Sequence, residues 1–153
     1  MAPPYNDCML SDRYWATDGD ERESYLESLN EDELLDLGIE LYQGAHYWNA
    51  HEAWEQVWLD APQELRLFYQ GLIQVTAAFV HVVRAEYPGS VRLLEAGIDK
   101  LSGYEPSQFG VDVAALRAAS QAALSRLREL GEKRVREFDM AMVPVIERRQ
   151  GSQ

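Results

Sequence analysis

The chain has 153 residues, of which 46% are hydrophobic and 26% charged, and this composition excludes a disordered or fibrous segment and suits one globular domain. Its formal net charge of -12 argues against a nucleic-acid backbone or an anionic membrane as partner, because association would have to overcome net repulsion. The charge is uneven: residues 1–60 hold 15 acids and two bases, whereas residues 61–153 hold 11 acids and 12 bases. The acidic first part favours a cationic or neutral partner.

Cellular location is predicted from three features. The single cysteine, Cys8, allows no intrachain disulfide and no cysteine-based metal site, which suits a reducing cytoplasm. The first residues lack the basic start and apolar stretch of a secretion signal, so no export is expected. Residues 67–83 carry no charge, but this run is shorter than the roughly 20 apolar residues that a membrane-spanning helix needs. We therefore predict a cytoplasmic protein with a buried central helix.

Helical periodicity dominates the chain, and no alternating run indicates a sheet. The predicted class is all-α: a compact bundle of about six helices built around a long central antiparallel helical hairpin. The patterns divide the chain into an N-terminal arm (1–19), a helical bundle domain (20–131) and a C-terminal helix or tail (132–153).

The first predicted helices cover about residues 20–29 and 31–43. Asn30 followed by Glu33 has the form of a capping box that opens the second of them, and Gly44 is expected to end it. A third helix is predicted over residues 47–59.

A fourth helix is expected to follow Asp60 as its cap and to end before Pro88. Gly71, in its middle, indicates a close helix crossing, with Trp48 or Trp54 filling the space. Ser90 is predicted to cap a fifth helix and Asp112 a sixth. Residues 41–58 also resemble one tetratricopeptide unit. Because no second copy recurs after about 34 residues, a repeat array is not expected, although a protein-binding helical hairpin stays open.

A polar set embedded in aromatic and aliphatic sequence is the most informative feature of the chain. Ionisable groups among so many core residues are costly unless they are paired or used. The predicted site residues are His51, Glu52 and Glu55 on the third helix and Arg66, Gln70 and Gln74 on the fourth, flanked by Tyr47, Trp48, Trp54 and Trp58. The three tryptophans are expected to pack in the core.

A tight turn between the two helices would make them antiparallel, so facing residues can be paired. The expected pairs are Trp58 with Arg66, Glu55 with Gln70, His51 with Gln74, and Gly44 with His81. In this arrangement the side chains of His51 and Glu55 project inward, toward the amides of the fourth helix.

Three functions fit this cluster. It can bind a small polar ligand, which is the preferred hypothesis; it can be a structural network in a module that binds a protein partner or a second copy of the chain; or it can serve a metal-dependent hydrolase. The hydrolase hypothesis is the weakest, because Glu55 stands where a zinc-protease helix has its second histidine. No cofactor and no metal are predicted, and His51 and Glu55 are the candidates if a metal binds.

At these residues the sequence resembles domain-of-unknown-function family 309. The resemblance lies in Gly44-x-x-Tyr47-Trp48-x-Ala50-His51-Glu52-x-x-Glu55-x-x-Trp58 and Arg66-x-x-x-Gln70-Gly71-Leu72-Ile73-Gln74-x-x-Ala77, with His81 and residues 89–101 following. It covers about residues 34–105. It implies a compact α-helical domain with the six polar residues as signature positions, and it brings no established activity. The family often has an acidic residue where Asn49 stands here.

Overall fold

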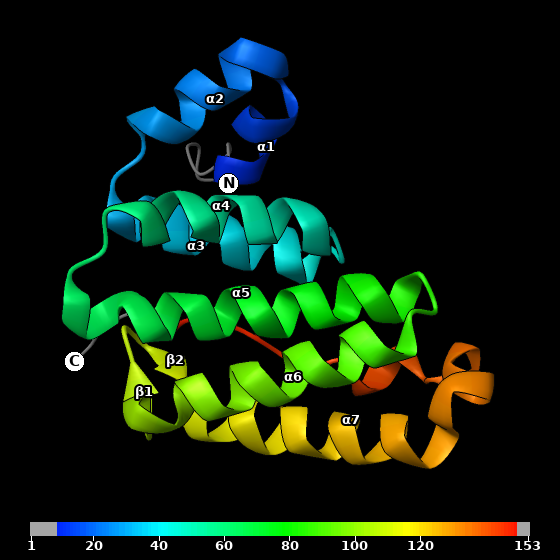
Figure 1. Cartoon of the computed structure of the whole chain (residues 1–153). Helices are drawn as coiled ribbons and strands as arrows, with labels where there is room; N and C mark the ends of the chain where they lie inside the picture. The colour runs from blue at the N-terminus through cyan, green and yellow to red at the C-terminus, as the bar shows by residue number, and fades with distance from the viewer. Residues whose placement is uncertain (1–8, 150–153) are drawn as a thin grey trace, which may run out of the picture.

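The computed structural model describes residues 9–149, and in this range seven α-helices and one short β-hairpin are stacked in layers (Figure 1). The helices are α1 (Leu10–Trp15), α2 (Gly19–Ser28), α3 (Glu31–Gln43), α4 (Tyr47–Leu59), α5 (Gln63–Val83), α6 (Tyr87–Leu101) and α7 (Val113–Arg134), and the strands are β1 (Ser107–Gln108) and β2 (Val111–Asp112). The α1–α2 pair lies at one end of the stack and α7 at the other, with α5 between α4 and α6 (Figure 1). The all-α class is confirmed.

Two helix starts follow the predicted capping chemistry. The Glu33 amide donates to Asn30 Oδ1 at 2.8 Å, and the Asn30 amide donates to Glu33 Oε1 at 3.0 Å, which completes the capping box of α3. The Ala115 amide donates to Asp112 Oδ1 at 2.9 Å at the start of α7. The Asn30 amide oxygen and the Asp112 carboxylate thus each accept a hydrogen bond from a backbone amide that has no partner within the first helical turn.

The predicted caps of α5 and α6 are wrong. Pro62, not Asp60, is the N-cap residue of α5, and α6 begins at Tyr87 with Pro88 in its first turn. Proline opens a helix readily because the amide it lacks would have no partner in the first turn. Ser90 lies inside α6, where its hydroxyl donates to the Tyr87 carbonyl at 2.8 Å.

The turns α3–α4 and α5–α6 have the same construction. Ala45 and Ala85 both adopt a left-handed conformation, with φ of 65° and 59°, and the residue after each donates its amide to the carbonyl five positions earlier, at 2.8 Å in both turns. Helix α3 ends at Gln43 with Gly44 as its C-cap residue, as predicted, but Gly44 has a φ of -84° and the left-handed position falls on Ala45. The same turn therefore occurs twice, 40 residues apart, whereas the sequence was searched for a repeat of about 34 residues.

Glycines allow two close helix crossings. A Cβ at Gly71 would lie 2.6 Å from Leu101 Cγ, so the predicted crossing exists, but its partner is α6 rather than a tryptophan. Trp54 instead covers Gly38 of α3, where a Cβ would lie 2.0 Å from Trp54 Nε1. Trp54 is fully buried and its Nε1 donates to the Leu35 carbonyl at 3.3 Å.

The segment after α7 returns across the bundle to α3. Arg148 pairs with Asp32, lies 3.0 Å from Asp36 Oδ1 and donates from Nε to the Phe109 carbonyl at 2.7 Å. Strands β1 and β2 pair beside it, and Val111 forms a bridge with Arg148. These strands were not predicted, because two residues are too few to form an alternating pattern. The division at residues 19 and 131 stays a prediction, and Cys8 lies outside the described residues.

We expect Arg148→Gln to lower the free energy of unfolding by about 1–3 kcal/mol, because it removes the cation that lies between two carboxylates. One of them, Asp36, is only one-third exposed, so water would compensate little for the lost ion pair. Urea denaturation measures the change. Arg136→Gln, at an exposed position, is the control and should leave stability within about 0.5 kcal/mol of the wild type. Equal losses in the two variants would contradict an anchoring role for Arg148.

Candidate functional site

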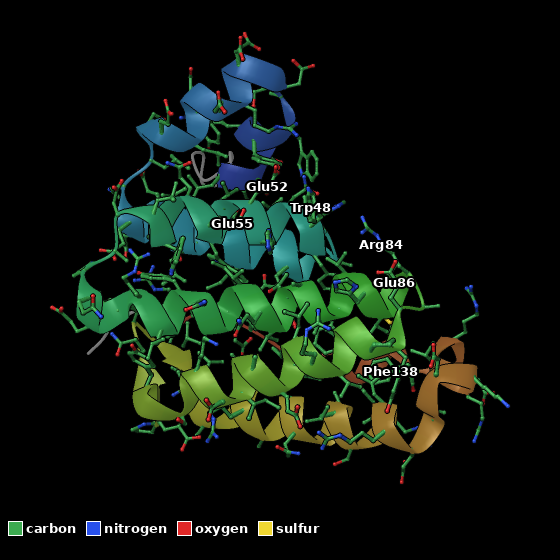
Figure 2. The ribbon with its side chains drawn as sticks, viewed as in Figure 1. Trp48, Glu52, Glu55, Arg84, Glu86 and Phe138 are labelled. Carbon is green, nitrogen blue, oxygen red and sulfur yellow. The ribbon has the colours of Figure 1, made fainter. Side chains whose placement is uncertain are left out.

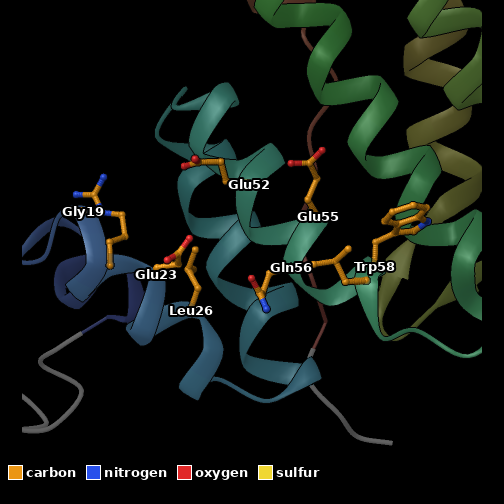
Figure 3. Close-up of a pocket in the computed structure, with 9 residues that line it drawn as sticks. Gly19, Glu23, Leu26, Glu52, Glu55, Gln56 and Trp58 are labelled. Carbon is orange, nitrogen blue, oxygen red and sulfur yellow. The ribbon is translucent and has the colours of Figure 1, made fainter.

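The predicted polar residues of α4 point to two different sides of the helix. In Figure 3, Glu52 points toward α1 and α2, whereas Glu55 and Trp58 point toward the side where α5 lies. The residues that were expected to form one cluster are thus divided. One group faces the N-terminal helices, and the other lies along the α4–α5 seam. We use this name for His51, Glu55 and Trp58 of α4 and for Arg66, Gln70 and Gln74, which share one face of α5. Glu55 and Trp58 also contribute to the pocket between α2 and α4.

Glu52 is held by the N-terminal helices. The Tyr14 hydroxyl donates to Glu52 Oε1 at 2.9 Å and accepts from Asn49 Nδ2 at 2.8 Å. The Tyr14 side chain is fully buried, and its pKa is raised mainly by this burial and also by Glu52, against the lowering effect of Asn49. Tyr14 therefore stays a neutral donor and fixes the position of the carboxylate.

Along the α4–α5 seam, the predicted pairing of Trp58 with Arg66 is confirmed. Arg66 Nη1 donates to the Trp58 carbonyl at 3.2 Å, and its guanidinium carbon lies 4.2 Å from the centre of the indole ring. This geometry combines a hydrogen bond with a cation–π contact. It fixes which turns of α4 and α5 face each other.

His51 and Glu55 behave differently from each other. His51 Nδ1 lies 3.6 Å from Glu55 Oε1, and the His51 side chain is only 15% exposed, as expected for an inward position. The Glu55 side chain is 53% exposed, so its predicted inward position is wrong. The neutral amide of Gln70 across the seam would not offset the cost of burying a carboxylate.

The predicted pairing of His81 with Gly44 is wrong. His81 turns to Glu86, with 2.6 Å between Nδ1 and Oε1, and packs on Gly89 instead.

The flanking aromatic residues also divide. Trp54 lies in the core, and Tyr47 packs against Tyr42 with 5.3 Å between ring centres. Trp48 was expected in the core but is 52% exposed, and it stacks on His51 with ring centres 5.2 Å apart and an angle of 13° between the planes. Figure 2 shows Trp48 and Glu55 at the surface of α4. An exposed indole over a shielded imidazole covers one part of the seam.

A groove of about 530 Å³ lies between α2 and α4. Each helix contributes residues one turn apart. They are Gly19, Arg22, Glu23 and Leu26 from α2, and Glu52, Glu55, Gln56, Trp58 and Leu59 from α4. We call this the α2–α4 groove (Figure 3). It takes three residues of the predicted site, but its α2 wall was missed, although the spacing of residues 19, 22, 23 and 26 places them on one helical face.

The charge of the α2–α4 groove is unbalanced. Glu23, Glu52 and Glu55 line it, and Arg22 is its one base in the part of the chain that the structure describes. Arg22 donates to the carbonyls of Tyr14 and Thr17, at 3.2 Å and 2.5 Å, and its guanidinium carbon lies 4.2 Å from the centre of the Tyr14 ring. Because the three carboxylates outnumber this one guanidinium, the potential in the groove is negative.

A metal centre finds no support in this arrangement. Within residues 9–149, no group of three or more histidine, cysteine, aspartate or glutamate side chains is placed to hold a metal ion. No helix in the same range is long and apolar enough to cross a membrane.

Comparison with known proteins supports the motif. The model of a family described as "Domain of unknown function (DUF309)" matches residues 35–93. The match spans the seam and the α4 side of the groove, whereas the α2 wall lies outside it. Searches of curated proteins and of solved structures return no match. The predicted resemblance is therefore confirmed: residues 35–93 of this chain match the DUF309 family.

Proposed function

We propose that this protein binds a small, positively charged polar ligand in the α2–α4 groove. The observation that carries the proposal is that three carboxylates line a groove of about 530 Å³, in which Arg22 is the single base among the described residues and contacts backbone carbonyls and an aromatic ring. Carboxylates that face each other across a gap repel, and a cation between them removes that repulsion.

The other lining residues indicate the shape of the ligand. Leu26 and Leu59 add apolar surface, and Leu59 is 60% exposed. A short aliphatic chain can lie on these leucines while an amine at each end approaches a carboxylate. The carboxylates are spread over two helices and are not gathered round one point, which favours an extended cation over a single metal ion. A linear diamine fits this description.

Binding is favoured over catalysis because, among residues 9–149, no histidine, cysteine, serine or threonine lines the groove. The metal-dependent hydrolase has no ligand set among residues 9–149. A basic protein partner is the second candidate, supported by the excess of 13 acids over bases in residues 1–60. Such a partner would place a lysine or arginine side chain among the same carboxylates. A cytoplasmic setting stays a prediction.

We expect 1,4-diaminobutane to bind the wild-type protein at low ionic strength, and the double variant Glu52→Gln with Glu55→Gln to bind it about tenfold more weakly. The substitutions keep size and preserve an acceptor for Tyr14, so the lost charge is isolated. Isothermal titration calorimetry measures the affinity, and circular dichroism checks that the variant is folded.

Glu132→Gln is the matched control, because Glu132 is exposed on α7, at the far end of the stack from α2 (Figure 1). Its affinity for the diamine should equal that of the wild type. If the control loses as much affinity as the double variant, the diamine responds only to net charge and the groove is not its site.

A further inference from the structure

Polar atoms on the α4–α5 seam lack hydrogen-bond partners. His51 Nδ1, Gln74 Oε1 and Trp58 Nε1 are shielded from solvent, and within residues 9–149 none of the three has a hydrogen-bond partner, the nearest carboxylate oxygen to His51 Nδ1 being Glu55 Oε1 at 3.6 Å. A shielded polar atom without a partner lowers stability, so native proteins hold few of them, and they are often satisfied by a bound molecule.

The register of the seam brings two of these atoms together. Trp58 contacts Arg66, which fixes one pair of facing turns. Because α4 and α5 are consecutive helices that pack on each other, moving back about two turns from Trp58 leads to His51, and moving forward about two turns from Arg66 leads to Gln74. His51 and Gln74 thus occupy the same part of the seam without bonding to each other.

Trp48 closes this part of the seam from outside. Its indole stacks on the His51 ring with 5.2 Å between centres, while 52% of the Trp48 surface is exposed. Because half of the indole is already in water, it can rotate away at little cost in buried area. His51 would then be open to a small molecule.

We propose that Trp48, His51 and Gln74 form a second binding site, which takes a small neutral molecule that both donates and accepts hydrogen bonds. Gln74 Oε1 only accepts, so the molecule donates to it, and His51 Nδ1 accepts or donates according to where the imidazole proton lies. A primary amide has both functions. A neutral molecule fits better than an ion, because an ion would lose its water in a part of the seam that offers it only an amide and an imidazole. The nearest carboxylate, on Glu55, is half-exposed at the rim of the seam.

This second site is independent of the α2–α4 groove. Glu55 and Trp58 belong to both the seam and the groove lining, but the three residues of the second site, Trp48, His51 and Gln74, do not line the groove. These three residues lie within the 35–93 segment that matches DUF309, whereas the α2 wall of the groove does not. Failure of diamine binding therefore leaves this inference standing, and failure of amide binding leaves the groove proposal standing.

Titration of ¹⁵N-labelled full-length protein with acetamide tests the inference. We expect saturable shifts of the Gln74 side-chain amide and the His51 ring nitrogens, with a dissociation constant in the millimolar range. The Trp54 indole N–H is the internal control, because it is fully buried and already donates to the Leu35 carbonyl. Non-saturable shifts, or equal shifts at Trp54, would overturn the proposal, as would a bound water at His51 that acetamide does not displace.

Gln74→Met provides the matched variant, since methionine keeps the length of the side chain and removes the unpartnered acceptor. It should weaken acetamide binding by at least about fivefold while keeping or raising the melting temperature. Gln63→Met, at an exposed position in the first turn of α5, should change neither. The proposal would be contradicted if the Gln74→Met protein were more stable and still bound acetamide as the wild type does. Gln74 Oε1 would then only lower stability and would take no part in binding.

Discussion

Replacing Gly38 with alanine is expected to lower the free energy of unfolding by about 3–5 kcal/mol. The new Cβ would lie 2.0 Å from Trp54 Nε1 and 2.3 Å from its Cε2, far inside contact distance. Trp54 is fully buried, so it can make room only by disturbing the α3–α4 interface and its own hydrogen bond to Leu35. Overpacking and the broken hydrogen bond each contribute about 1–3 kcal/mol. Urea denaturation followed by tryptophan fluorescence measures the loss.

Gly103→Ala is the control for this substitution, because a Cβ at Gly103 meets no atom within 4 Å. Its stability should stay within about 0.5 kcal/mol of the wild type. A similar loss in both variants would mean that the Gly38–Trp54 contact does not hold α3 and α4 together, and the groove that α4 lines would lose its support.

Strong destabilisation above about pH 10 is the second large effect that we expect. Burial raises the pKa of Tyr14, Tyr42, Tyr47 and Tyr69, and nearby Glu31 raises that of Tyr69 further. The folded chain therefore keeps protons that the unfolded chain releases near pH 10. The stabilisation is complete below the ordinary tyrosine pKa and is lost as pH rises through and beyond it.

Each of these tyrosines lowers the free energy of unfolding by up to about 1.4 kcal/mol for each pH unit above pH 10. Urea denaturation at about pH 8 and about pH 11 measures the loss, and the ultraviolet absorbance of tyrosinate reports ionisation directly. A Tyr42→Phe and Tyr69→Phe double variant should start from lower stability, since the Tyr42 hydroxyl donates to the Pro144 carbonyl at 2.6 Å, but it should lose less between the two pH values. Unchanged wild-type stability across this range would contradict the burial of these hydroxyls.

Local signals in the sequence account for much of the helix order. Asn30 with Glu33, and Asp112, cap α3 and α7 as predicted, because a cap depends on residues within one turn. The same reasoning failed at Ala45 and Ala85, where the chain takes a left-handed turn without glycine. No local sequence pattern predicts a left-handed conformation at these two alanines. It follows from the packing of the helices on either side, which outweighs the modest cost of the conformation for alanine.

The candidate site shows the same limit. The contact between Trp58 and Arg66 could be predicted because both residues flank one short turn. The α2–α4 groove could not, because it depends on where α1 and α2 dock. That docking is fixed by contacts between residues far apart in the chain, such as Tyr14 with Glu52 and the Ser11 amide with Glu40 Oε1 at 2.7 Å.

A crystal structure of the full chain grown with 1,4-diaminobutane would show directly whether the groove binds a diamine. We expect the diamine in the α2–α4 groove, with an amine within hydrogen-bond distance of Glu52 or Glu55 and the carbon chain against Leu59. A structure in which α2 packs closely onto α4 and leaves no groove, or in which the diamine lies elsewhere on the protein, would contradict it.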